Sequence, residues 1–478
     1  MFEATGEDVE VSGITADSRH VKPGFLFAAL PGTKTDGAHF AAEALRQGAV
    51  AILGTPALKS GLPENAPAFL SADNPRQAFA TLAARFYGTQ PRKIAAVTGT
   101  NGKSSVVGFA RQIWEHAGLR AASLGTLGLE PPVASAEGTA LTTPDPARLH
   151  ALLAELAAQK IDHVALEASS HGLEQFRLDG VRLCAAVFTT LSRDHLDYHG
   201  TMDAYLAAKL RLFSELLDED GTAILNADDA ACGAFEKACT QRGLSVLRYG
   251  EKGDGLRLIE SVPTEDGQDV RFEIFGKEAC VPLALIGAFQ AKNALAALGL
   301  AHATGVEAGA ALAALAALRG VPGRMEALGR IANGARVYVD YAHTPDALAH
   351  ALGTLRPYAK ARLHVLFGCG GDRDRGKRPE MGAIADALAD AVYVTDDNPR
   401  NEDAATIRQE ILVASRKGKE IAGRAQAIHA AIEGLQAGDA LLIAGKGHEQ
   451  GQILGAEILP FDDREVARAA MGINGGAS

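Results

Sequence analysis

The sequence has little cysteine, and its cysteines follow no recognisable pattern. There are five in 478 residues, an odd number, and no two of them stand at CxxC spacing. A disulfide framework and a cysteine zinc site are therefore both disfavoured. We expect the protein to work in a reducing compartment.

Long apolar runs are also missing. Met1–Ala4 carries an acidic residue where a secretory signal would place lysine or arginine, and no apolar stretch follows it. The Ala-rich run 310–318 is far shorter than the roughly 20 residues that span a bilayer. We therefore expect a cytoplasmic protein without a membrane partner.

An excess of basic residues is absent as well. Lys and Arg number 47 against 58 Asp and Glu, which gives a net charge of -11. Nucleic-acid binding depends on cations that neutralise phosphates, so we expect no nucleic-acid partner. Small-molecule substrates and a monomeric state are the expectation, and anionic substrates must meet local basic positions.

The chain is long enough for several domains, since single cores stop growing near roughly 250–300 residues. Short apolar runs alternate with helical patterns, which predicts an α/β fold with mostly parallel sheets. Gly-Thr-Gln-Pro at 88–91 and Gly-Val-Pro-Gly at 320–323 interrupt the pattern. We predict three domains, at 1–90, 91–323 and 324–478.

The first two segments each show an α/β unit. In the first, 25–30 and 49–53 are predicted strands on either side of a helix at 38–47. In the second, a strand at 93–97 leads through a glycine-containing turn into an amphipathic helix at 104–116.

The third segment repeats a strand followed by a polar loop. Because the carboxyl ends of parallel strands meet at one edge, the loops after these strands should line one crevice. The predicted strands are Val337–Tyr341, Leu363–Phe367, Ala391–Thr395 and Ala440–Ala444.

The turn after the strand at 93–97 has the composition of a phosphate-binding loop. Gly99, Thr100, Asn101 and Gly102 would bring backbone N–H groups to phosphates, and Lys103 would neutralise their charge. Ser104 is placed to ligate Mg2+, with Ser105 after it. Val97 stands where the general P-loop has its first glycine.

With this departure, the loop sequence at 98–104 resembles that of the Mur ligase and folylpolyglutamate synthetase superfamily more closely than that of GTPases or kinases. The resemblance covers essentially the whole chain and implies a central ATPase-type parallel sheet and a Rossmann-like C-terminal domain. Further motifs carry it, at 17–19, 141–144, 167–171, 340–345, 397–400 and 445–449.

The resemblance also implies ATP and Mg2+ as cofactors. Glu167, which follows an apolar run, His195 and Lys209 join Ser104 as expected metal-site residues. Taken alone, Lys209 would be an ordinary surface lysine. The family position is a lysine that reacts with CO2 to give a carbamate, whose negative charge would attract Mg2+.

Other positions match nucleotide and substrate contacts of the family. Asn293, Arg324 and Asp340 match ATP contacts, although Asn293 and Asp340 could equally be cap or turn residues. His343 would orient the nucleotide or the acyl phosphate. For the substrate UDP-MurNAc-L-Ala-D-Glu, the matching positions are Ser18, Thr33, Lys34, Thr35, Thr142, Thr143, Ser169, Gln175 and Arg177.

The second substrate implied is meso-diaminopimelate, whose distal carbon carries an amine and a carboxylate. Arg400 and Arg373 offer guanidinium groups for that carboxylate, and Glu449 offers a counter-charge for the ammonium. Asp397, Asn398, Pro399 and Gly445 complete the family pattern. A solvated basic loop is the alternative for Arg373, because Arg375, Lys377 and Arg378 follow it closely.

The implied reaction is ATP-dependent amide-bond formation through an acyl phosphate, in peptidoglycan precursor synthesis. Lys103, Lys209 and His343 are its expected catalytic residues. Rival hypotheses are an L-lysine-adding homologue, the ligase that adds D-Ala-D-Ala, a folylpolyglutamate synthetase, and a P-loop protein without ligase activity. The Asp-Asn-Pro-Arg sequence at 397–400 argues against the other enzymes.

Overall fold

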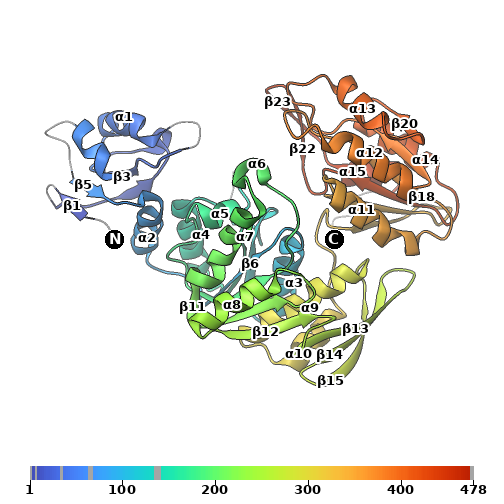
Figure 1. Cartoon of the computed structure of the whole chain (residues 1–478), viewed down its shortest axis with the longest axis horizontal. Coiled ribbons are helices and arrows are strands. Elements are labelled where there is room, and N and C mark those ends of the chain that lie inside the picture. The colour runs from blue at the N-terminus through green and yellow to red at the C-terminus, as the bar shows by residue number, and fades with distance from the viewer. Residues whose placement is uncertain (1–2, 6–7, 33–35, 63–67, 134–140, 474–478) are drawn as a thin grey trace. The chain divides into compact units, whose positions relative to one another are not determined.

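The computed structural model describes residues 3–5, 8–32, 36–62, 68–133 and 141–473 (Figure 1). Its secondary structure forms three larger sheets and one two-stranded hairpin. The predicted α/β class is confirmed. The chain divides into two compact units, one of residues 1–257, 274–276 and 293–314, the other of 258–273, 277–292 and 315–478. The three domain boundaries stay predictions.

The N-terminal sheet buries both of its faces. Its strand order is β1-β5-β4-β3-β2, parallel except for β1. Leu26 and Ala28 pack with helix α2, whereas Phe27, which points to the other face, packs with helix α1. The elements are β1 Glu3–Thr5, β2 Gly13–Thr15, β3 Phe25–Ala28, α1 Ala41–Arg46, β4 Ala51–Gly54, β5 Ala68–Ser71 and α2 Pro75–Tyr87.

One prediction in this sheet region needs correction. The segment expected as a helix over 38–47 begins as a 3-10 turn, Gly37–Phe40, and is α-helical only over Ala41–Arg46. Asp36 caps the 3-10 turn by accepting a hydrogen bond from Ala38 N at 2.9 Å. The tighter turn follows from this local cap.

The central sheet has the order β15-β14-β13-β12-β11-β10-β6-β9-β7-β8. The strands from β12 to β7 run parallel, and β8 returns antiparallel. Its strands are β6 Lys93–Thr98, β7 Ala121–Gly125, β8 Gly128–Glu130, β9 His163–Glu167, β10 Leu183–Phe188, β11 Leu217–Asn226, β12 Ser245–Gly250, β13 Leu256–Pro263, β14 Gln268–Ile274 and β15 Lys277–Leu283.

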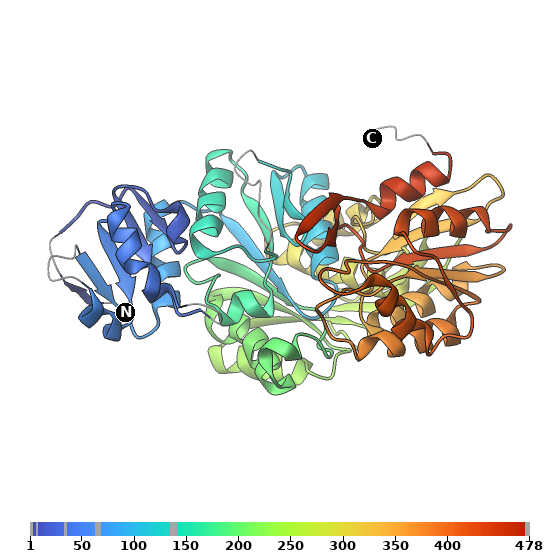
Figure 2. The same cartoon turned by 90° about the horizontal axis from the view of Figure 1, so that it is seen from above.

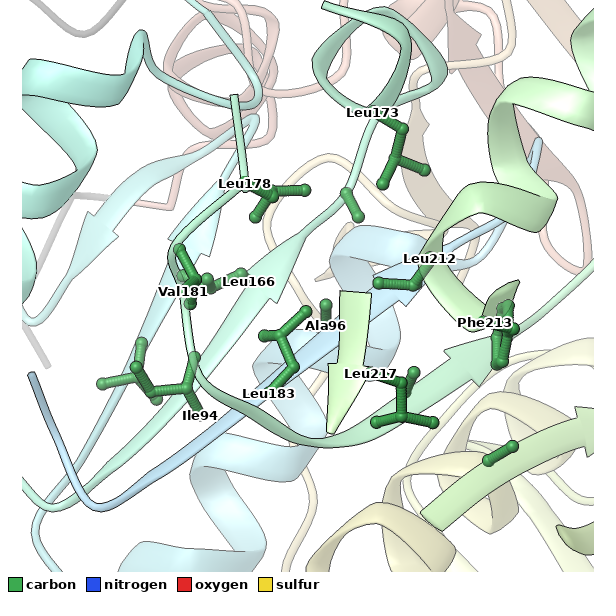
Figure 3. Packing of buried hydrophobic residues seen from close by; sticks show 14 of the residues in the cluster. Ile94, Ala96, Leu166, Leu173, Leu178, Val181, Leu183, Leu212, Phe213 and Leu217 are labelled. Atoms are coloured by element: carbon green, nitrogen blue, oxygen red, sulfur yellow. The ribbon is translucent and has the colours of Figure 1, made fainter. Parts of the chain in front are cut away.

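Apolar side chains on one face of this sheet form a dense core. Ile94 and Ala96 of β6 and Leu166 of β9 pack with Leu183 of β10 and Phe213 (Figure 3). The helices of this region are α3 Lys103–His116, α4 Pro146–Ala158, α5 Ser170–Glu174, α6 Leu196–His199, α7 Met202–Arg211, α8 Cys232–Arg242, α9 Ala288–Ala303 and α10 Ala308–Leu315.

The C-terminal sheet has helices on both faces, as a Rossmann-like fold requires (Figure 2). Its order is β16-β17-β21-β18-β19-β20, with only β16 antiparallel. Helices α11, α12 and α13 pack with Val365 and Phe367, and α14 and α15 pack on the other face with Leu366.

The strands of this domain are β16 Glu326–Arg330, β17 Arg336–Asp340, β18 Leu363–Phe367, β19 Ala391–Val394, β20 Gly418–Glu420 and β21 Ala440–Ala444, with the hairpin β22 Gly451–Leu454 and β23 Glu457–Pro460. The helices are α11 Pro345–Leu355, α12 Lys377–Leu388, α13 Ala404–Leu412, α14 Arg424–Glu433 and α15 Asp463–Ala470. Because β17, β21, β18 and β19 are adjacent and parallel, their following loops share one edge, as predicted.

Candidate active site

The glycine-containing turn between β6 and α3 is a tightly braced loop. Gly99 and Gly102 have φ values of +147° and +91°, which strongly favour glycine. Thr189 Oγ1 donates to Asn101 O at 2.6 Å, and Thr100 N donates to Thr190 O at 2.7 Å. The loop is therefore held by the segment after β10.

Both lysines of the predicted catalytic set reach this loop. Lys103 Nζ donates to Gly99 O and Thr100 O, each at 2.9 Å. Lys209 Nζ also donates to Gly99 O at 2.9 Å. Ser104 and Ser105 are buried in the first turn of α3, and Asn293 lies beside Gly102.

Lys209 is not a surface lysine, because only 1% of its surface is exposed. Its ammonium lies 4.3 Å from the centroid of the Tyr205 ring. Burial, assisted by the positive charge of Lys103, lowers the pKa of Lys209 well below its ordinary value, and Asp194 opposes this only in part. The environment favours a neutral amine.

Glu167 and His195 differ strongly in exposure. Glu167 is buried at the end of β9, where its carboxylate accepts hydrogen bonds from Thr126 N and Thr126 Oγ1, both at 3.0 Å. The side chain of His195 is 48% exposed, next to Asp194 at 3.5 Å. Partial burial lowers the pKa of His195.

The four predicted metal-site residues fit Mg2+ only in part. Ser104 and Glu167 supply the oxygen ligands that Mg2+ prefers, whereas His195 and an unmodified Lys209 offer nitrogen. Within the described residues, no group of three His, Cys, Asp or Glu side chains is gathered for a metal. A carbamate on Lys209 would add the missing oxygens, so the metal set stays a prediction.

Five predicted substrate residues of the central domain form one hydrogen-bonded network. Arg177 donates to Thr143 O and to Gln175 Oε1, both at 2.7 Å. Thr143 Oγ1 lies 3.0 Å from Ser169 Oγ and donates to Glu167 O at 2.8 Å. Thr142 joins through Thr126, whose Oγ1 lies 3.1 Å from Thr142 Oγ1 and donates to the Glu167 carboxylate. The structure brings these five residues together. Their contacts with substrate remain a prediction.

The expected N-terminal contacts are only partly described. Ser18 is half-buried in a 3-10 turn, Ser18–His20, that Asp17 caps. A hydrogen bond from Arg19 lowers the pKa of Asp17 to about 2. Thr33, Lys34 and Thr35 lie outside the described residues.

Three further expected nucleotide residues gather in the C-terminal domain. Asp340 accepts hydrogen bonds from Met325 N at 2.7 Å and Ala342 N at 2.8 Å. Burial raises the pKa of Asp340, against the lowering effect of Arg324. The Arg324 guanidinium and the His343 ring each lie 4.6 Å from the Tyr341 ring.

The Asp397–Arg400 loop is locked to its neighbours. Arg400 has φ +52°, a conformation that is uncommon for a residue other than glycine. Its N–H donates to Ile453 O at 3.1 Å, and its carbonyl accepts from Gly455 N at 2.8 Å. The hairpin β22–β23 therefore fixes the backbone from which the Arg400 guanidinium projects.

The guanidinium of Arg400 in turn meets the loop after β18. Arg400 Nη1 donates to Gly371 O at 2.9 Å, and Gly371 N donates to Asn398 O at 2.9 Å. Pro399 O lies against Gly371, where a Cβ atom would collide with it. Arg373, on this loop, is exposed. The structure thus joins the two arginine-bearing loops.

Asn398 links its loop to the one after β21. Asn398 Nδ2 donates to Glu449 Oε2 at 3.0 Å, and Asp397 Oδ1 accepts from Asn398 N at 2.7 Å. Gly445, with φ +112°, passes close to Asp397, and a Cβ atom there would lie 3.0 Å from Asp397 Oδ2. These expected amine-site residues form one cluster.

Sequence reasoning missed several residues that support this cluster. Arg378 is completely buried and donates to Glu402, Glu410 and Gly370 O, although it belongs to the run of basic residues that typically faces water. Lys446 and Arg424 are also buried cations here. Of these three residues, only Lys446 had a signal in the sequence, because it lies in the Gly-Lys-Gly-His-Glu motif at 445–449.

Family models cover most of the chain. The Mur ligase middle domain matches residues 97–301, the Mur ligase, glutamate ligase domain matches 323–447, and the Mur ligase family, catalytic domain matches 10–87. The chain belongs to the Mur ligase family. It is accordingly an ATP-dependent ligase that joins a carboxylic acid to an amino acid.

Full-length relatives share half of the sequence. The chain is 53% identical over 468 residues to the UDP-N-acetylmuramoyl-L-alanyl-D-glutamate--2,6-diaminopimelate ligase of Bradyrhizobium diazoefficiens, covering 97% of this chain and 95% of that protein. It is 50% identical over 476 residues to the enzyme of the same name from Caulobacter vibrioides, covering 98% and 97%.

Solved Mur ligase structures share the fold. A structure of a UDP-N-acetylmuramoyl-L-alanyl-D-glutamate--2,6-diaminopimelate ligase matches with a TM-score of 0.70 and 35% identity, covering 97% of this chain and 95% of that one. MurF ligase from Thermotoga maritima in complex with ADP matches at 0.62 and 19%, covering 92% and 95%. The second likeness supports the three-domain fold alone. Within the described residues, no helix could cross a membrane.

Proposed function

We propose that this Mur ligase uses ATP to join meso-2,6-diaminopimelate to the D-glutamate carboxylate of UDP-MurNAc-L-Ala-D-Glu, as a cytoplasmic step of peptidoglycan precursor synthesis. The observation that carries the proposal is the cluster of Arg400, Asn398 and Glu449, held by hydrogen bonds between three loops. Relatives 53% and 50% identical over nearly the full length are named for this activity.

The amine end of the reaction explains the composition of that cluster. The distal carboxylate of diaminopimelate needs a bidentate cation, which the Arg400 guanidinium offers. Its distal ammonium needs an acid, which Glu449 offers with 33% of its side chain exposed. L-Lysine lacks the distal carboxylate and would leave the Arg400 guanidinium without a carboxylate partner, a loss of about tenfold to a hundredfold in binding.

The acid end of the reaction proceeds through an acyl phosphate. The γ-carboxylate of D-Glu attacks the γ-phosphorus of ATP and releases ADP. The attacking amine of diaminopimelate then adds to the acyl carbon, loses a proton and expels phosphate. The backbone of Gly99–Gly102 and the Lys103 ammonium stabilise the phosphate charge, and Asn293, Arg324 and Asp340 hold the nucleotide. His343 orients the nucleotide or the acyl phosphate.

Mg2+, held by Ser104, Glu167, His195 and a modified Lys209, would supply further neutralisation of the phosphate oxygens.

Carbamylation of Lys209 joins the neutral amine to CO2 with loss of one proton. Burial and the lowered pKa of Lys209 support this modification, because only the neutral amine has the lone pair that attacks CO2. Intact mass measured with and without bicarbonate tests it. An unmodified amine in active protein, with rates indifferent to bicarbonate, would reject it.

The test of the function is a direct assay. Purified protein is incubated with ATP, Mg2+ and UDP-MurNAc-L-Ala-D-Glu, with either meso-diaminopimelate or L-lysine, and phosphate release and product mass are followed. A tripeptide product with diaminopimelate and none with lysine is expected. Product with lysine alone would retain the ligase and reject this pocket, and no product with either would reject the proposal.

A further inference from the structure

Lys446 is a fully buried cation at the centre of the amine-site cluster. It follows β21, and its side chain has no exposed surface. Its Nζ donates to Asn398 Oδ1 at 3.0 Å and to Glu449 Oε2 at 3.1 Å. A buried ammonium is costly unless it is paired, and here Asn398 and Glu449 supply its partners.

We propose that Lys446 is a positioning residue that sets the selectivity of the pocket for an amino acid with a zwitterionic distal end. It acts through Glu449 and Asn398. By sharing the Glu449 carboxylate, the Lys446 ammonium leaves too little negative charge to hold a lone distal ammonium. The proposal rests on the proposed function and deepens it.

The charges around Glu449 support this role. Arg400 and Lys446 contribute positive charge in or next to the cluster, and Glu449 and Asp397 contribute negative charge. The buried Arg424 beside them is neutralised by Asp463, so this further pair leaves the balance unchanged. A distal carboxylate paired with a distal ammonium brings no net charge into this balance. A distal ammonium alone adds a cation beside Lys446, and like charges at close range in a partly buried site repel.

The local hydrogen bonds allow selectivity to be separated from structure. Without the Lys446 ammonium, Asn398 Oδ1 still accepts from Ile453 N at 3.0 Å. Glu449 Oε2 still accepts from Asn398 Nδ2 at 3.0 Å. Neither acceptor is left without a donor, so a neutral side chain of similar length should preserve the loops.

The experiment compares two amines in the full-length Lys446→Met variant. The kcat and KM for meso-diaminopimelate and for L-lysine are measured with ATP, Mg2+ and UDP-MurNAc-L-Ala-D-Glu. We expect the ratio of the two kcat/KM values to fall by about tenfold or more, the size of one charged hydrogen bond. The change should come mainly from a lower KM for L-lysine.

Arg336→Met is the matched control. Arg336 is also a buried cation of this domain, but it begins β17 and pairs with Glu265 at 3.1 Å, at the opposite end of the strand from Asp340. Its removal should leave the ratio unchanged, whatever it does to stability. A merely structural role of Lys446 would lower both kcat/KM values together and leave their ratio at the wild-type level, which would overturn the proposal.

Lys446→Gln provides a second neutral variant in case the methionine variant does not fold, because an amide can still donate to Asn398 or Glu449. If neither variant folds, Lys446 serves the fold and the selectivity role is rejected. If the wild type makes no product with diaminopimelate, the proposed function itself fails. If the wild type is selective and a folded variant keeps its ratio, only the inference about Lys446 fails.

Discussion

Arg424 and Asp463 form a bidentate ion pair with no exposed surface on either side chain. Arg424 Nε and Nη2 each lie 2.7 Å from an oxygen of the Asp463 carboxylate. Arg424 also donates to Ala444 O at 2.9 Å and Asp396 O at 3.3 Å. One buried arginine thus joins the ends of β21 and β19, the strands from which two of the three amine-site loops begin.

Replacing one partner of this pair should destabilise the domain severely. Asp463→Asn leaves the Arg424 charge buried without its counter-charge, which costs about 3–5 kcal/mol of unfolding free energy. Urea unfolding followed by circular dichroism measures the loss. Arg271→Ala is the control, since Arg271 and Glu260 form an exposed pair at 3.2 Å, and such pairs contribute about 0–1 kcal/mol. Equal losses for the two variants would contradict the prediction.

The Arg378–Glu402 pair predicts a pH dependence of stability. Hydrogen bonding from Arg378, together with the Asp372 N–H, lowers the pKa of Glu402 to about 2 from an ordinary 4.5. A carboxyl group with a lowered folded-state pKa stabilises the fold above its unfolded pKa and loses that contribution as pH falls through the folded value.

The corresponding variant is Glu402→Gln. It should be less stable than the wild type at pH 7, and the difference should shrink as pH falls from about 4.5 toward about 2. Urea unfolding of both proteins across that range gives the difference directly. Glu457→Gln, at an exposed position of β23, should differ little from the wild type throughout. A Glu402→Gln difference that stays constant down to pH 2.5 would reject the pairing as its cause.

The fold and the loops that carry most of the motifs could be predicted from the sequence, because their signals are local. Alternating apolar runs marked the strands, and the glycines at 99 and 102 marked a turn, at which the structure has positive φ values. The motifs at 397–400 and 445–449 predicted one site, because loops at the carboxyl ends of parallel strands must meet.

Buried charges could not be predicted in the same way. Arg378 and Arg373 stand in the same run of basic residues, yet Arg378 is completely buried and Arg373 is exposed. What separates them is the position of Glu402 and Glu410, about 24 to 32 residues further along the chain. Partners at that separation are set by the tertiary fold, and no local pattern records them.

Arg400 should determine affinity for diaminopimelate more than stability. Arg400→Ala removes the guanidinium proposed for the distal carboxylate, so KM for diaminopimelate should rise by about tenfold to a hundredfold. Arg400→Lys should not restore it, because an ammonium cannot form the bidentate contact. Steady-state kinetics and urea unfolding measure the two effects. Full activity in the lysine variant would show that a single positive charge is enough.

Gly99 should tolerate no side chain. Its φ of +147° is unfavourable for other residues, and a Cβ atom there would overlap Thr189 Oγ1. Gly99→Ala must therefore displace Thr189, whose hydroxyl braces Asn101 O at 2.6 Å. It must also displace the carbonyl of residue 99 itself, which both Lys103 and Lys209 contact. We expect ATP turnover to fall by at least about a hundredfold, equivalent to roughly 2.7 kcal/mol of transition-state stabilisation.

Gly118→Ala is the control for backbone strain alone. Gly118 also has a positive φ, +76°, but a Cβ atom there meets nothing within 4 Å. The variant should lose about 1 kcal/mol of unfolding free energy and keep its ATP turnover. If Gly99→Ala and Gly118→Ala lose activity to the same extent, strain rather than the displaced phosphate loop is responsible. A fully active Gly99→Ala would show that the loop can move Thr189 without disturbing either lysine.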